Sequence, residues 1–216
     1  MSWLFLILFS GLISVDRRTA LHLMISRPLF ISLTIGIMTS NVYLCLLAGI
    51  MIEIYGSIDV PVGTKIPKDD SFLAYVFSLL IGFDVLHSPT DFIIGVLLCV
   101  VFLYPITFLE YLLRKINLSM YESFMKKHLL NPGSLIFRSL ILSFLKGVLG
   151  YNIVFLIVSF ILTELKFDFE IYGETYQYFI IVTMFLVGYI IRFLSFKSFY
   201  KYIVLLAGIA AGWFIA

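Results

Sequence analysis

Seven long apolar runs, separated by shorter polar stretches, make up most of the chain. They cover residues 3–15, 28–52, 72–86, 92–113, 135–163, 178–194 and 202–216. A helix that crosses a membrane needs roughly 20 apolar residues, and the runs at 92–113 and 178–194 fit this length directly. The pattern predicts an all-α, polytopic integral membrane protein with about six spanning helices.

The run at 28–52 is interrupted near its centre by the polar residues Thr39, Ser40 and Asn41. Turn-prone residues at this place predict two half-helices, 28–38 and 42–54, that form a broken or re-entrant hairpin. Irregular backbone at membrane depth is tolerated only where protein or a cavity surrounds it. The alternative is one continuous helix whose polar patch faces a neighbouring helix.

The basic residues favour the re-entrant form. If the hairpin enters and leaves on one side, thirteen of the fifteen lysines and arginines fall on that side, which the positive-inside rule assigns to the cytoplasm. The segment 164–174 contains Lys166 with four acidic residues and is predicted to lie outside. Both ends of the chain then face outside.

Composition narrows the classes of function. Hydrophobic residues make up 62% of the chain and charged residues 13%, whereas globular proteins have about 45–50% and 25%. A soluble domain of this composition would expose too much apolar surface, which excludes soluble enzymes and nucleic-acid-binding proteins. The net charge of +2 gives no reason to expect a nucleic-acid partner. We therefore treat residues 1–216 as one membrane-embedded domain in contact with the lipid bilayer.

The densest polar segment is 53–70, which glycines and prolines interrupt. Its polar members are Glu53, Asp59, Thr64, Lys65, Lys68, Asp69 and Asp70. Gly and Pro disfavour a regular helix and leave backbone groups available to a ligand. A polar, irregular segment beside a broken helix is typical of the substrate sites of secondary transporters. Its carboxylates and carbonyls could bind sugar hydroxyls or a cation, and the alternative is an ordinary loop outside the membrane.

Lys146 is an ionisable residue inside an apolar run. It lies about 17 Å along the run at 135–163, at 1.5 Å per residue, which predicts a position close to the middle of the membrane. A lysine at that depth is a functional hypothesis by default and requires a carboxylate partner such as Glu53. In the alternative the helix begins late and the side chain reaches the inner surface.

The segment 114–134 is predicted to be a cytoplasmic loop. Residues Ser119 to Glu122 match a capping box, which would start a basic amphipathic helix. Such a helix would lie on anionic lipid or dock a partner, and the alternative is a solvated connector.

Motifs of catalysis and metal binding are lacking in the sequence. His22, His87 and His128 are scattered without the spacing of metal ligands, and no nucleophile or phosphate-binding motif is present. Cys45 and Cys99 lie within apolar runs and are predicted to be packing residues. We therefore expect neither enzymatic activity nor a cofactor. The Gly208-x-x-x-Gly212 pattern allows close helix approach and favours an oligomer.

The stretch from residue 27 to residue 69 resembles a known family. The resemblance is carried by Arg27-Pro28-Leu29, Gly36, Asn41, Gly49, Glu53, Gly63 and Asp69, and it extends more weakly over 139–147 and 187–189. This spacing resembles the membrane subunit IIC of the mannose-fructose-sorbose family of the bacterial sugar phosphotransferase system. The chain is similar to a divergent, shorter member, with Asn41 where an aspartate is usual and Lys68 where a proline is common.

The resemblance implies a multi-pass permease subunit of the bacterial inner membrane that binds a hexose near the broken helix and passes it inward. It also implies a IID-like membrane partner and cytoplasmic IIA and IIB phosphocarriers, which carry out the phosphoryl transfer. Glu53, Asp69 and the region of Asn41 would line the sugar site, with Thr64 and Lys146 as further candidates. The alternative function is a non-transporting scaffold or sensor that has kept the fold.

Overall fold

The computed structural model describes residues 2–18, 23–56, 68–126, 132–164 and 203, and within these ranges it is built from helices and short turns. The helices are α1 (Ser2–Arg18), α2 (Pro28–Thr39), α3 (Val42–Gly56), α4 (Asp70–Gly82), α5 (Pro89–Lys126), α6 (Pro132–Leu145), the π-helix η1 (Lys146–Tyr151) and α7 (Asn152–Glu164). The all-α prediction is confirmed for these ranges. The predicted helices at 178–194 and 202–216 lie outside the described residues, apart from Ile203.

The break predicted in the run at 28–52 is present between α2 and α3. Pro28 starts α2 at a position where its missing N–H costs nothing. The helix ends at Ser40, which adopts a left-handed conformation with φ of 63°. The N–H of Asn41 donates to the carbonyl of Gly36 at 3.0 Å, so the turn satisfies this carbonyl in the last turn of α2. The single continuous helix, which was the alternative, is wrong.

Helices α2 and α3 form an antiparallel hairpin, and a glycine on each helix lets the two pack closely. A Cβ atom on Gly36 would lie 2.9 Å from the Cα of Val42, and one on Gly49 would lie 2.8 Å from the Cβ of Ser32. Hydrogen at these positions lets the two backbones approach closely, as in small-residue contacts between membrane helices. The two ends of the hairpin, near Arg27 and Glu53, consequently lie side by side.

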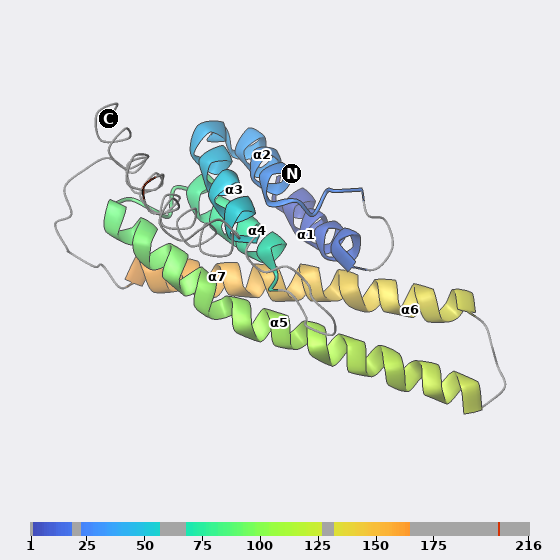
Figure 1. Ribbon diagram of the computed structural model, residues 1–216. Coiled ribbons are helices and arrows are strands. Elements are labelled where there is room, and N and C mark those ends of the chain that lie inside the picture. Colours follow the sequence, from blue (N-terminus) through green and yellow to red (C-terminus); the bar gives the residue numbers. More distant parts are fainter. Residues whose placement is uncertain (1, 19–22, 57–67, 127–131, 165–202, 204–216) are drawn as a thin grey trace.

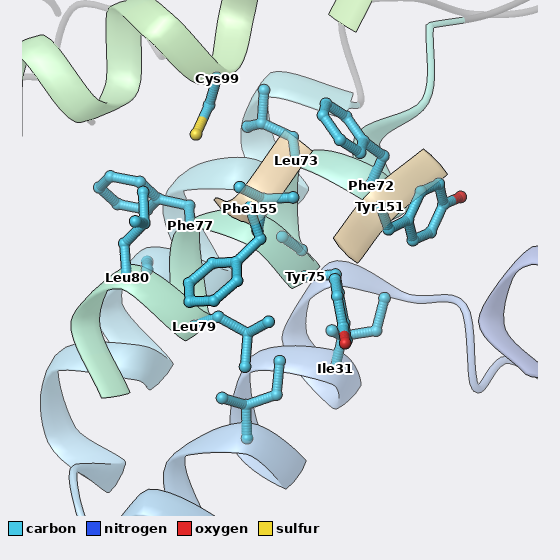
Figure 2. Close-up of a cluster of buried hydrophobic side chains, with 14 of the residues drawn as sticks. Ile31, Phe72, Leu73, Tyr75, Phe77, Leu79, Leu80, Cys99, Tyr151 and Phe155 are labelled. Atoms are coloured by element: carbon cyan, nitrogen blue, oxygen red, sulfur yellow. The ribbon is translucent and has the colours of Figure 1, made fainter. Parts of the chain in front are cut away.

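Helix α4 lies at the centre of the described part. It packs on α2 and α3 on one side and on α5 and α7 on the other, and every residue from Ser71 to Ile81 is buried. Figure 2 shows its aromatic and leucine side chains meeting Ile31 of α2, Cys99 of α5 and Phe155 of α7. The predicted packing roles of Cys45 and Cys99 are confirmed, since both are buried and unpaired as thiols.

Two long rods form the other layer of the structure. One is α5, and the other is the continuous run of α6, η1 and α7; in Figure 1 they lie together below α1–α4 and extend past them at one end. The stretches Thr90–Lys126 and Pro132–Glu164 are long and apolar enough to cross a membrane. The predicted loop at 114–134 is wrong at both ends, because residues up to Lys126 continue α5 and residues from Pro132 belong to α6. No helix starts at Ser119, so the capping-box interpretation is also wrong.

Charged residues of the described ranges lie in two layers. One layer holds every described lysine and arginine, together with six acidic residues; the other holds only acidic residues. The six are Asp16, Glu53, Asp69, Asp70, Glu110 and Glu122, and the second layer consists of Asp84, Asp91 and Glu164. Between the layers, α5 carries no charged residue from residue 92 to residue 109, and α7 none before Glu164. The rise from Asp91 to Glu110 corresponds to about 28 Å. An uncharged zone of that thickness thus separates the layer that contains all the described basic residues, which we call the basic layer, from a layer whose charged residues are all acidic.

Candidate functional site

The open end of the α2–α3 hairpin holds an ion pair that is partly accessible to water. Arg27 Nη1 donates to Glu53 Oε1 at 2.8 Å, and the N–H of Leu29 lies 3.4 Å from Glu53 Oε2. The side chains of Arg27 and Glu53 are 60% and 29% exposed. We call this the exposed ion pair. The pair joins the start of α2 to the last turn of α3, at the end where the two half-helices open.

Asp69 lies beside this end but is almost completely buried, with 2% of its surface exposed. Its Oδ1 accepts the N–H of Phe72 at 3.1 Å, which caps the start of α4. Its Oδ2 accepts from the Tyr151 hydroxyl at 2.9 Å and from Lys146 Nζ at 3.1 Å. Arg17 Nη1 lies 3.3 Å from Oδ1. Both carboxylate oxygens are therefore engaged.

The ammonium group of Lys146 is shared between two carboxylates. Its Nζ lies 3.1 Å from Asp69 Oδ2 and 3.1 Å from Glu110 Oε2 of α5, and only 4% of its side chain is exposed. The predicted Lys146–Glu53 pair is wrong, because Glu53 binds Arg27 instead. Lys146 also lies level with Glu110, at the edge of the uncharged zone, because the first 14 residues of its rod extend past that zone.

The π-helix explains why Lys146 and Tyr151 act on the same carboxylate. Residues five apart point in different directions on an α-helix, but a π-turn closes i→i+5 hydrogen bonds and aligns them. Lys146 and Tyr151 are the first and last residues of η1, and the ammonium lies 5.7 Å from the centre of the tyrosine ring. Such turns are frequent at functional sites.

Arg17 ties the end of α1 to the start of α4. Its guanidinium pairs with Asp70, donates to Ser71 Oγ at 2.6 Å and donates to the Lys68 carbonyl at 2.6 Å. We call Arg17, Asp69, Glu110 and Lys146 the buried ion cluster. Charges buried in this way are tolerated only when they are paired and hydrogen-bonded, and each member has at least one oppositely charged partner.

Asp16 fixes the chain that leads into the hairpin. It is 1% exposed, and its two oxygens accept the N–H groups of Leu23 at 2.6 Å and Ser26 at 2.9 Å. The Ser26 carbonyl in turn accepts from Ser71 Oγ at 2.6 Å. These bonds place Arg27 relative to the start of α4, and thus place the exposed ion pair relative to the buried ion cluster.

Aromatic rings border the same region. Lys68 Nζ lies 5.9 Å from the centre of the Tyr55 ring and 5.5 Å from that of Tyr104, within range of a cation–π interaction. Tyr104 is 64% exposed. Carboxylates and a guanidinium hydrogen-bond to hydroxyl groups, while tyrosine rings offer apolar faces with a polar tip. This combination suits a polyhydroxylated molecule better than an apolar one.

The predicted site residues divide into three groups. Glu53, Asp69 and Lys146 gather at one end of the described structure. Asn41 does not join them: its side chain amide lies 3.5 Å from the Ile81 carbonyl at the opposite end of α4, and the rise along α3 separates it from Glu53 by about 18 Å. Thr64 lies outside the described residues.

Three residues of the site were missed by the sequence analysis. Glu110 is an acidic residue within the apolar run at 92–113, and an ionisable group in such a run is a signal that could have been used. Arg17 was one of the thirteen basic residues assigned to the cytoplasmic side, and no partner was predicted for it. Tyr151 carried no signal, because nothing in its sequence surroundings predicts a π-turn.

Comparison with other proteins leaves the family open. No protein-family model matches the chain, and no curated protein matches it significantly. Among the residues that the structure describes, no group of three or more His, Cys, Asp or Glu side chains is arranged to hold a metal ion.

Proposed function

We propose that this chain is the sugar-translocating IIC subunit of a phosphoenolpyruvate-dependent phosphotransferase system of the mannose-fructose-sorbose type. The observation that carries the proposal is the open end of the α2–α3 hairpin, where Glu53 is held by Arg27 and remains partly accessible. The resemblance assigns Glu53 and Asp69 to the sugar site, and both residues lie at this end. In the proposal, Glu53 accepts hydrogen bonds from sugar hydroxyls, and the subunit passes the sugar to a partner that phosphorylates it.

The two charged layers support a membrane position for the uncharged zone between them. Its thickness, about 28 Å, is close to the roughly 30 Å of a bilayer's hydrocarbon core. The basic layer then faces the cytoplasm of a bacterial inner membrane. In this arrangement α1, α4, α5 and the rod of α6, η1 and α7 cross the membrane, while the α2–α3 hairpin enters and leaves on the cytoplasmic side.

A reconstituted uptake assay tests the proposal. The chain is expressed with a IID-like subunit and IIA and IIB phosphocarriers in a bacterial host that lacks its own mannose-class permease, and uptake of radiolabelled mannose, glucose and fructose is measured. We expect uptake that depends on this chain and yields sugar phosphate inside the cell. If a complete, membrane-inserted complex takes up none of the three sugars, the proposal fails and the non-transporting scaffold becomes the better account.

A further inference from the structure

We infer that Glu110 is a positioning residue that holds Lys146 when sugar takes its place on Asp69. The inference rests on the proposed function and adds a role for a residue on α5 that neither the sequence pattern nor the resemblance assigns. Lys146 and a sugar hydroxyl compete for the same carboxylate oxygen, Asp69 Oδ2. Glu110 supplies the second carboxylate that keeps the ammonium paired while this exchange takes place.

Asp69 has no free carboxylate oxygen in this structure. A carboxylate binds a sugar by accepting hydrogen bonds from its hydroxyl groups, yet both Asp69 oxygens already accept from protein groups and the residue is 2% exposed. Of these partners, the Phe72 N–H is fixed in the first turn of α4, whereas Lys146 Nζ stands at the end of a flexible four-carbon chain. The other donor to Oδ2 is the hydroxyl of Tyr151, whose ring is completely buried, so Lys146 is the partner of this oxygen that can move.

The ammonium group of Lys146 lies equally close to both carboxylates. Its nitrogen is 3.1 Å from Asp69, which precedes α4, and 3.1 Å from Glu110, which belongs to α5. A buried ammonium that lost its only carboxylate would be strongly unfavourable. With Glu110 present, the loss of Asp69 leaves one carboxylate in place. The other oxygen of Glu110, Oε1, lies 3.8 Å from Nε of Arg114, whose side chain is 52% exposed.

The two carboxylates that share Lys146 lie on different parts of the fold. Asp69 precedes α4, which packs against the α2–α3 hairpin, while Glu110 and Lys146 lie on the two long rods. A shift of the ammonium from Asp69 toward Glu110 loosens one ionic link between these parts. Binding of sugar at Asp69 is thereby connected to the movement that alternating access requires.

The test compares the KM and maximal rate of mannose uptake in the reconstituted complex for the unmutated chain and three variants. In Glu110→Gln, sugar binding leaves Lys146 without a carboxylate, so we expect KM to rise about tenfold. Glu110→Asp keeps the charge and, because the lysine can follow the shorter side chain, should restore most of the affinity. Tyr151→Phe removes a competing donor from Asp69 Oδ2, so its KM should fall severalfold. Maximal rates are normalised to the amount of complex in the membrane.

The opposite changes in KM expected for Glu110→Gln and Tyr151→Phe distinguish a positioning role of Glu110 from a purely structural one. General damage to the fold would lower the maximal rate of every variant and would not raise KM in one while lowering it in the other. An unchanged KM in Glu110→Gln, or a rise in Glu110→Asp equal to that in Glu110→Gln, overturns the inference while the proposed function stands. An unmutated complex without uptake overturns the proposed function and this inference together.

Discussion

Two groups of paired charges lie at the same end of the molecule, but water reaches them very differently. The exposed ion pair, Arg27–Glu53, has side chains that are 60% and 29% exposed, whereas the buried Lys146 and Asp69 side chains are 4% and 2% exposed. An exposed pair contributes little to stability, while a buried pair that loses one partner leaves an uncompensated charge. Glu53 is therefore accessible to a ligand from water, whereas Asp69 is buried and its carboxylate is bound to protein groups.

The largest effect is expected from removing the buried cation. Lys146→Met leaves Asp69 and Glu110 facing each other in the interior, so we expect the free energy of unfolding to fall by about 3–5 kcal/mol. Thermal unfolding of the purified chain in detergent measures this. In the triple variant Lys146→Met, Asp69→Asn and Glu110→Gln, the negative charges are removed as well, and most of the loss should be recovered. Equal stability of Lys146→Met and the unmutated chain would contradict the buried pairing.

An intermediate effect is expected at the π-helix that carries the cluster. A Cβ on Gly147 would lie 2.7 Å from the Cβ of Ser14 and would also strike the Ser10 carbonyl, so α1 would have to move. Gly147→Ala should cost about 1–3 kcal/mol of unfolding free energy. Gly150→Ala is the matched control in the same turn, since its Cβ would meet only side-chain atoms, the nearest at 3.3 Å. The same detergent melts compare the two, and equal losses would refute the close approach of α1 and η1.

The smallest stability effect is expected at the exposed ion pair. Glu53→Gln removes one half of a partly solvated pair, and the unfolding free energy should change by less than about 1 kcal/mol. The same melting experiment compares this variant with Lys146→Met. A loss at Glu53 as large as that at Lys146 would remove the distinction between the two groups of charges.

Much of the fold could be predicted because its determinants are local. The break in the run at 28–52 follows from Ser40 and Asn41, and the positions of the apolar helices follow from their length. The helix at 114–126 was not predicted, because its polar residues indicated a loop. In the structure α5 continues through these residues beside α6, and Asn117 Nδ2 of α5 donates to Ser139 Oγ of α6 at 3.0 Å.

The candidate site could be predicted only in part, because its pairing is not local. Asp69 and Lys146 are 77 positions apart, and Glu110 and Lys146 are 36 apart. Sequence reasoning identified Lys146 as needing a carboxylate but chose Glu53, since nothing along the chain says which acidic residue a helix will bring within reach. The π-turn adds to the difficulty, because it changes which residues share a face.

The measurement that tests the central claim most directly is sugar uptake by Glu53→Gln in the reconstituted complex. Glu122→Gln on the exposed far end of α5 is the matched control. Loss of a charge-assisted hydrogen bond to a sugar hydroxyl corresponds to about 1.5–3 kcal/mol, or roughly a 10- to 150-fold fall in transport efficiency. The account predicts this fall for Glu53→Gln at an unchanged melting temperature, with full uptake by Glu122→Gln. Unchanged uptake by Glu53→Gln at an unchanged protein level would contradict it.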